Sequence, residues 1–195
     1  MFDIKYGTDT VSWVNLKNLR VVGKNRKRAS MYQPTHVYPL KKLFEELNIP
    51  QGKIFIDLGC GKGRVLLVAS EFGFKELRGI EFASELCKTA VTNCSVYKDK
   101  TGTKAEFQII ESDVVDYDIH DEDVFFMFHP FDDFVLRQVL RKITLSLLMN
   151  KRKIWIIYRN PVHKDIIGRM KEFIKVKDVI FWGSDFLVFT NITDY

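Results

Sequence analysis

Phe55-Ile-Asp-Leu-Gly-Cys-Gly-Lys-Gly-Arg64 is a glycine-rich turn with a short apolar strand before it and a helical pattern after it. Residues 54–58 have the composition of a buried strand, and apolar residues recur at helical spacing over 65–69. Glycines in such a turn tolerate unusual backbone angles and let a ligand approach the bare main chain. The first N–H groups of the following helix are free to face that ligand. The stretch therefore predicts an α/β protein that holds a nucleoside-like cofactor.

The spacing of the glycines narrows the choice of cofactor. A dinucleotide fingerprint would need its third glycine at Arg64, and a P-loop would need Ser or Thr directly after Lys62. What remains is the pattern D-x-G-x-G-x-G from Asp57 to Gly63, which resembles motif I of the class I methyltransferases that use S-adenosyl-L-methionine. This resemblance implies that Asp57 helps to hold the amino group of the cofactor. It also implies that the turn lies against the methionine part, with these cofactor-binding residues: Leu58, Gly59, Cys60, Gly61 and Gly63.

Length and composition predict one globular domain. The 195 residues are 46% apolar and 28% charged, as in ordinary soluble proteins. Apolar runs stay far below the roughly 20 residues that span a bilayer. We therefore expect no membrane association and a cytoplasmic location. Three cysteines without metal-site spacing are expected to be reduced, and no metal is predicted.

The net charge of +5 favours acidic partners without identifying one. The densest basic run is Lys24-Asn-Arg-Lys-Arg28. A solvated loop is the favoured interpretation, because no aromatic residue interrupts the run to stack on bases. Nucleic-acid binding stays open as an alternative.

Strands and helices alternate along the chain. Strands are expected near 54–58, 77–81, 105–110, 124–128, 153–158, 177–182 and 186–191, and helices over 36–47, 64–72, 83–97, 132–148 and 163–174. Such alternation predicts a mostly parallel sheet with helices on both faces, a three-layer α/β sandwich. Only Gly183, Ser184 and Asp185 separate the last two strands, so these should form an antiparallel hairpin. Seven strands ending in a hairpin resemble the class I methyltransferase sheet over residues 36–192, with residues 1–35 as an N-terminal segment.

Acidic residues end the second and third predicted strands, where ligands of open α/β sheets bind. Glu81 follows the glycine turn by about 20 residues, and a carboxylate there can accept two hydrogen bonds from ribose hydroxyls. The family resemblance gives Glu81 that role, places Phe82 beside the adenine, and assigns Asp113 to the adenine amino group with Val114 nearby. The alternatives are a helix-dipole role for Glu81 and a solvated acidic loop for Asp113.

The fourth predicted strand runs into His129-Pro130-Phe131, at the position of motif IV in the same family. The resemblance implies that these three residues line the methyl-transfer site, although the family more often has Asn or Asp in place of His129. A histidine can accept a proton near neutral pH, which suits an acceptor that is deprotonated as it is methylated. It can equally satisfy a buried carbonyl. The fifth strand ends in a second polar-proline turn, where Tyr158, Arg159 and Asn160 are candidate acceptor-pocket walls, with simple turn formation preferred.

The segment ahead of motif I contains Met31-Tyr-Gln-Pro-Thr-His36. By resemblance to class I enzymes, Tyr32, Gln33 and Thr35 are candidates for a lid over the cofactor, and Thr35 is alternatively an N-cap of the next helix. Residues 1–30 contain no recognisable motif. Trp13, with its apolar neighbours Val11, Val14 and Leu16, is expected to dock on the core.

Together these features predict an S-adenosyl-L-methionine-dependent methyltransferase acting by direct displacement. Its acceptor is expected to be a protein lysine or a small molecule. The glycine turn, the acidic second strand and the aromatic motif IV resemble those of some lysine methyltransferases. Two alternatives stay open: a sensor or partner subunit that binds the cofactor without transferring its methyl group, and a methyltransferase that binds nucleic acid.

Overall fold

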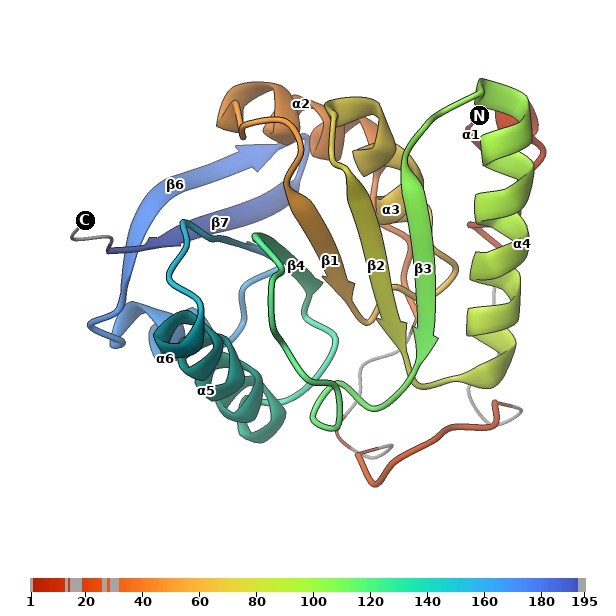
Figure 1. Cartoon of the computed structure of the whole chain (residues 1–195). Coiled ribbons are helices and arrows are strands. Elements are labelled where there is room, and N and C mark those ends of the chain that lie inside the picture. Colours follow the sequence, from red (N-terminus) through yellow and green to blue (C-terminus); the bar gives the residue numbers. More distant parts are fainter. Residues whose placement is uncertain (1, 13, 15–18, 26–27, 29–31, 193–195) are drawn as a thin grey trace.

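A computed structural model describes residues 2–12, 14, 19–25, 28 and 32–192. Its centre is a seven-stranded sheet in the order β3-β2-β1-β4-β5-β7-β6 (Figure 1). Six strands run in one direction and β7 runs against them, which confirms the predicted sheet with its C-terminal hairpin. The strands are β1 (Ile54–Leu58), β2 (Glu76–Glu81), β3 (Glu106–Glu111), β4 (Val124–Phe128), β5 (Trp155–Arg159), β6 (Phe173–Phe181) and β7 (Ser184–Asn191).

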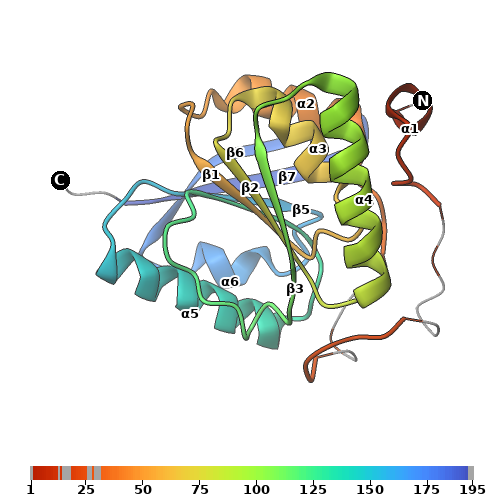
Figure 2. The same ribbon diagram turned by 45° about the vertical axis from the view of Figure 1, so that its right-hand side comes forward.

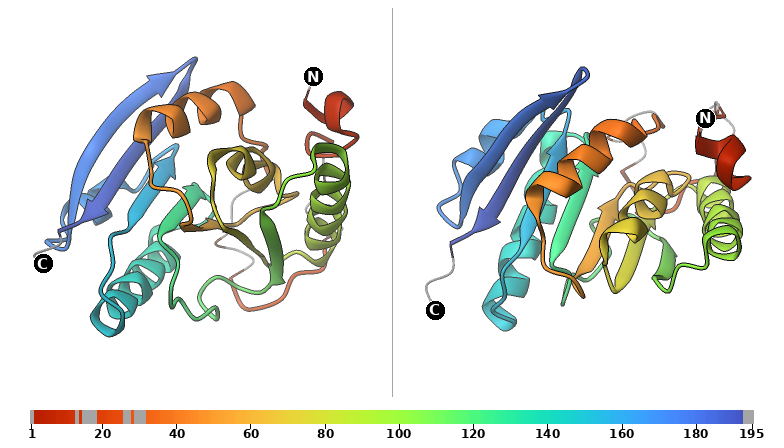
Figure 3. Two further views of the ribbon diagram at one scale, coloured as in Figure 1. Left: turned by 45° about the horizontal axis from the view of Figure 1, so that its top comes forward. Right: turned by 90° about the horizontal axis from the view of Figure 1, so that it is seen from above.

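Helices cover both faces of the sheet, as predicted. Figure 2 shows α2, α3 and α4 on one side and α5 and α6 on the other, and Figure 3 shows α2 between the β6–β7 hairpin and α3. One core packs Leu40 and Leu66 against Phe55, and the other packs Leu136 against Phe125. The helices are α1 (Phe2–Tyr6), α2 (Val37–Leu47), α3 (Arg64–Ala69, continued by a 3-10 turn Ser70–Phe72), α4 (Ser84–Thr101), α5 (Asp133–Met149) and α6 (Lys164–Gly168).

The C-terminal region differs from the prediction in two places. The helix expected over 163–174 is wrong beyond Gly168, because Phe173–Phe181 pairs with β7 as a long strand. The apolar residues of this stretch fit both the helical and the strand period, and hydrogen bonding to β7 stabilises the strand. The hairpin turn consists of Trp182 and Gly183, with φ of 48° and 76°, instead of the predicted residues 183–185. Positive φ at both central residues matches the right-handed twist of the paired strands.

The N-terminal segment docks through polar contacts that the sequence did not predict. Arg64 Nε donates to Thr10 Oγ1 at 2.6 Å, and the same guanidinium pairs with Asp3 at 3.4 Å. Lys62, beside it in the glycine turn, donates to Asp9 Oδ2 at 3.0 Å. The Asn93 amide on α4 donates to the carbonyls of Asp9 and Lys62, at 2.9 Å each. Residues 2–12 are therefore attached directly to the glycine turn.

The prediction that apolar residues of the N-terminal segment dock on the core is confirmed in part. Val14 packs against a small cluster that contains Leu19 and Leu86, whereas Val11 is 45% exposed. Trp13 and Leu16 lie outside the described residues.

Three features of the described part of the chain bear on the predicted class of protein. None of its helices combines the length and apolar character needed to cross a membrane. Within the same residues, no group of three or more His, Cys, Asp or Glu side chains is arranged to hold a metal ion. The three cysteines are buried and unpaired.

Candidate functional site

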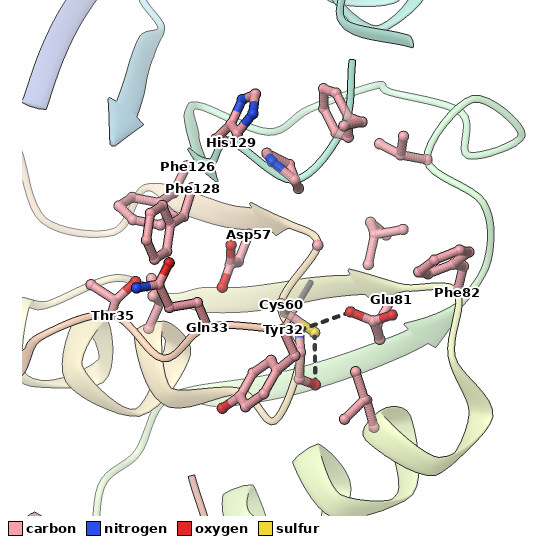
Figure 4. Close-up of a pocket in the computed structure, with 18 of the residues that line it drawn as sticks. Tyr32, Gln33, Thr35, Asp57, Cys60, Glu81, Phe82, Phe126, Phe128 and His129 are labelled. Carbon is pink, nitrogen blue, oxygen red and sulfur yellow. Dashed lines mark hydrogen bonds between the residues drawn. The ribbon is translucent and has the colours of Figure 1, made fainter. Parts of the chain in front are cut away.

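A pocket opens where the strands β1, β2, β4 and β5 end, and it collects most of the predicted site residues (Figure 4). Asp57 and Glu81 face it from neighbouring strands, Tyr32 and Gln33 face it from the N-terminal segment, and His129 faces it from the end of β4. The predicted residues that line it are Tyr32, Gln33, Thr35, Asp57, Gly59, Cys60, Gly61, Glu81, Phe82, Asp113, Val114, His129, Pro130 and Phe131.

Two predicted residues do not line the pocket. Leu58 is fully buried in the core on the α5 side of the sheet. Gly63 is the N-cap of α3, with φ of 83°, and a Cβ at this position would lie 3.4 Å from Ala90 Cβ on α4. Both residues thus support the turn through packing.

The other two glycines of the turn bring separate segments of the chain together. Gly59 has φ of 90°, and a Cβ there would lie 2.7 Å from the Cβ of Pro130. Gly61 has φ of 55°, and a Cβ there would collide with the ring of Tyr32. L side chains rarely adopt such angles, so both positions require glycine for conformation as well as for space. The turn therefore brings the motif IV loop and the N-terminal segment onto one pocket.

Two buried carboxylates face the pocket beside this turn. Glu81 accepts hydrogen bonds from the backbone N–H groups of Gly61 and Ala83, at 2.9 Å each. Burial raises the pKa of Glu81 above its ordinary value, and these N–H donors oppose that shift. Burial raises the pKa of Asp57 strongly, and the nearby Glu81 adds to the effect. Asp57 makes no side-chain hydrogen bond to the residues that the structure describes, which leaves its carboxyl group free for a ligand.

Asp113 reaches the pocket already bonded to the chain. Its carboxylate accepts from the Asn25 side-chain amide at 2.8 Å and from the Val115 N–H at 3.2 Å. Asn25 belongs to a stretch that the sequence did not connect with the site. This stretch runs beside the end of β2, where Val22 N–H donates to the Phe82 carbonyl at 2.9 Å. Leu19 and Asn25 of this stretch line the pocket.

The segment before α2 forms another wall of the pocket. The Tyr32 hydroxyl donates to the Thr10 carbonyl at 2.7 Å, and burial raises the pKa of this tyrosine. Thr35 is buried, and its carbonyl accepts from Arg64 at 3.4 Å. The N-cap of α2 is His36, without a side-chain cap, so the alternative interpretation of Thr35 as an N-cap is wrong.

His129 ends β4 in a left-handed conformation, with φ of 38°. Its Nδ1 lies 3.5 Å from the Tyr158 hydroxyl, and its ring centroid lies 5.4 Å from that of His163. Burial lowers the pKa of His129, and the nearby His163 lowers it further. The imidazole is therefore neutral near pH 7 and able to accept a proton.

The end of β5 supports the same side of the pocket. The Arg159 guanidinium stacks over the ring of Phe128 at 3.7 Å, and Phe128 lines the pocket. Burial lowers the pKa of Arg159 to about 10. Asn160 lines the pocket as well, although simple turn formation was the preferred interpretation of this residue.

Two described residues of the basic run, Asn25 and Arg28, have contacts within the chain. Asn25 bonds Asp113, and Arg28 pairs with Asp132 at 2.7 Å. Arg26 and Lys27 lie outside the described residues, as does Met31 of the predicted lid segment. The nucleic-acid alternative thus keeps only part of its original support.

The family model for the histone methylation protein DOT1 matches residues 3–123 of the chain. The chain belongs to this family. A protein-lysine N-methyltransferase of Saccharolobus islandicus (strain REY15A) is 30% identical over 98 residues, which are 50% of this chain. The match spans 58% of that relative's length.

Solved structures show the same fold. The structure of a putative RNA methyltransferase from Pyrococcus horikoshii has a TM-score of 0.61 at 20% identity, covering 92% of this chain and 94% of that one. An RNA methyltransferase from Salinibacter ruber, in complex with S-adenosyl-L-homocysteine, has a TM-score of 0.59 at 20% identity, covering 84% and 98%. Together with the family match, this likeness in fold confirms the predicted resemblance to the class I methyltransferases.

Proposed function

We propose that this protein is an S-adenosyl-L-methionine-dependent methyltransferase whose acceptor is the side-chain amine of a protein lysine. The observation that carries the proposal is the meeting of Asp57, Glu81 and the glycine turn in one pocket that His129 also lines. The family membership and the name of the Saccharolobus relative support the choice of a protein lysine. The site residues other than Leu58 and Gly63 keep their predicted roles as part of this proposal.

The residues of the pocket fit the cofactor. Glu81 offers buried acceptor oxygens for ribose hydroxyls, and Asp57, which has no side-chain hydrogen bond to the described residues, offers a carboxylate for the amino group. Phe82 and Val114 provide an apolar edge for the adenine, and the turn at Gly59 leaves bare backbone for the methionine part. When bound, the cofactor supplies a methyl group on a positively charged sulfur, which keeps the electron pair of the broken carbon–sulfur bond.

The acceptor side of the pocket fits an amine that must lose a proton. A protonated lysine amine has no lone pair, so it must be deprotonated before it can be methylated. His129 is neutral near pH 7 because burial lowers its pKa, and its Nδ1 faces the Tyr158 hydroxyl. With the ring hydrogen on Nδ1, donated to the Tyr158 oxygen, Nε2 is available to take the proton. His129 then passes the proton to water, which restores the neutral imidazole.

Calorimetric titration with S-adenosyl-L-methionine and S-adenosyl-L-homocysteine tests the cofactor assignment. We expect both to bind the folded protein. The absence of binding for both compounds would refute the assignment.

Incubation with methyl-labelled cofactor and a cell extract, followed by separation of protein, nucleic acid and small molecules, tests the acceptor. We expect label in protein, on lysine after hydrolysis. Label confined to nucleic acid or to small molecules would instead support those acceptor classes. Cofactor binding without transfer to any fraction would support the sensor alternative.

A further inference from the structure

Two turns of the same construction close the pocket beside β4 and β5. Each strand is followed by a polar residue with positive φ and then by proline: His129 with φ of 38° before Pro130, and Asn160 with φ of 48° before Pro161. The strands are paired in register, with Phe128 opposite Arg159. The two polar residues therefore follow the last pair of the ladder side by side. Left-handed non-glycine residues carry a conformational cost and cluster at functional sites.

The backbone alone makes the turn at Asn160. Its N–H donates to the Asp185 carbonyl at 3.2 Å, and its own carbonyl accepts from the Val162 N–H at 2.8 Å. The carboxamide side chain makes no hydrogen bond to any residue in the described ranges, and Asn160 is one of the residues that line the pocket. Turn formation therefore accounts for the backbone of Asn160, and its exposed side chain is available to a ligand.

The preceding residues of β5 hold the acceptor side in place. The Tyr158 hydroxyl lies 3.5 Å from His129 Nδ1 and accepts from the His163 N–H at 3.4 Å. The Arg159 guanidinium lies 3.7 Å from the ring centre of Phe128. Phe128 and His129, which both line the pocket, are thus supported from β5, and Asn160 is the first residue after that strand.

We propose that Asn160 binds the acceptor, presenting its side-chain carbonyl oxygen to the amino group beside His129. The inference rests on the proposed function for the identity of that amino group. An ammonium group has three N–H donors and no acceptor, so a single imidazole leaves two donors unpaired. A neutral carbonyl can pair one of them. It also stabilises the charged amine less than a carboxylate would, so the amine still releases its proton to His129.

Replacement of Asn160 by Gly and by Asp tests this role. Glycine removes the carboxamide and keeps the left-handed backbone. Asn48 has φ of 46° at the end of α2, outside the pocket lining, so Asn48→Gly is the matched control. For Asn160→Gly we expect the KM for a lysine-containing peptide to rise about 10- to 100-fold, the loss of one hydrogen bond to a charged group. The Kd for S-adenosyl-L-homocysteine should stay unchanged in both Gly variants.

The aspartate variant separates binding from turnover. Asn160→Asp should bind the protonated amine at least as tightly as the original protein and should lower kcat, because the carboxylate retains the proton on the amine. A structural role in the turn predicts no such split between KM and kcat. Unchanged KM in Asn160→Gly, or a loss of cofactor affinity in that variant alone, would overturn the proposal.

A measurement without cofactor makes the inference independent of turnover. The side-chain amide of Asn160 is labelled with nitrogen-15 and identified by its absence from the spectrum of Asn160→Gly. Addition of N-acetyl-lysine methylamide should shift this signal, whereas the trimethyl-lysine analogue, whose side-chain nitrogen carries no N–H group, should not. Equal shifts with both compounds, or none with either, would contradict the proposal. A shift in a protein that binds no S-adenosyl-L-methionine would leave Asn160 as an amine-binding residue and refute only the proposed transferase.

Discussion

The two halves of the pocket are built in different ways. On the side of β1 and β2, glycines at positive φ make the turn, and Glu81 is bonded to two backbone N–H groups. On the side of β4 and β5, His129 and Asn160 adopt positive φ without being glycine. The Glu81 carboxylate is thus held by backbone donors, whereas the Asn160 side chain has no hydrogen-bond partner among the described residues.

The β1–β2 side of the pocket is thus ordered before a ligand binds, whereas the β4–β5 side has a side chain that is open to an acceptor. Backbone hydrogen bonds hold the carboxylate of Glu81 in position before any ligand binds, which reduces the cost of ordering the site. In the other half, the Asn160 side chain can bond an acceptor without first breaking a hydrogen bond to the described residues. We therefore expect substitutions on the first side to affect cofactor affinity, and substitutions on the second side to affect the acceptor or the pH profile.

Gly59→Ala should have the largest effect, because it damages the junction of the two halves. The added Cβ would lie 2.7 Å from Pro130 Cβ at a backbone φ of 90°, so the turn or the proline loop must move. We expect cofactor affinity to fall by more than about 100-fold and the free energy of unfolding to fall by roughly 1–3 kcal/mol. Calorimetry and denaturant unfolding measure the two effects. Gly102→Ala, with open space around its Cβ and a φ of 66°, is the control for backbone strain alone.

Glu81→Ala should weaken cofactor binding by at least about 100-fold, because it removes two hydrogen bonds to a charged group that are each worth about tenfold or more. The loss also frees the Gly61 and Ala83 N–H groups that order the turn. Calorimetry with S-adenosyl-L-homocysteine measures the affinity. Glu106→Ala, on the exposed part of β3, should bind normally. Normal binding by Glu81→Ala would show that this carboxylate is not part of the cofactor site.

Asp57→Asn should weaken cofactor binding by roughly tenfold and stabilise the free protein. Burial raises the pKa of Asp57, so the folded chain binds this proton more tightly than the unfolded chain does. The protonated carboxyl group therefore stabilises the folded protein fully below pH 3.8, the ordinary pKa of aspartate. This stabilisation is lost as the pH rises through the pKa that Asp57 has in the folded protein. At about pH 7 the variant should therefore gain on the order of 1 kcal/mol, or 2–4 °C in Tm. The gain should disappear near pH 4, and a lower Tm at neutral pH would contradict this account.

His163→Gln should give the smallest effect, confined to the acceptor half. Burial is the main cause of the lowered pKa of His129, and His163 is the second. Removing His163 should raise the pKa of His129 and move the acid limb of kcat upward by less than about one pH unit. Proton NMR of the His129 ring measures the same shift directly. His120→Gln, in an exposed loop, is the matched control, and equal profiles for both variants would remove His163 from the description of the site.

The sequence predicted those features that depend on local pattern. The helical and strand periods of the apolar residues predicted the order of strands and helices. The glycine spacing, together with Glu81 and Asp113, placed the predicted cofactor residues at the ends of adjacent strands. Because carboxyl ends of parallel strands meet at one edge, these residues came together in the pocket. The prediction of a helix beyond Gly168 was wrong because the stretch fits both the helical and the strand period. Pairing with β7 makes it a strand.

Features that depend on contacts between distant segments were decided by the tertiary structure. The docking of residues 2–12 on Lys62 and Arg64 requires side chains more than fifty positions apart to meet, and no local pattern encodes such a meeting. Asn160 resembled an ordinary turn residue in the sequence, and only the register of β4 with β5 brought it beside His129. Local backbone preference thus determined the glycine turn and its neighbouring strands, whereas long-range packing and pairing determined what faces them across the pocket.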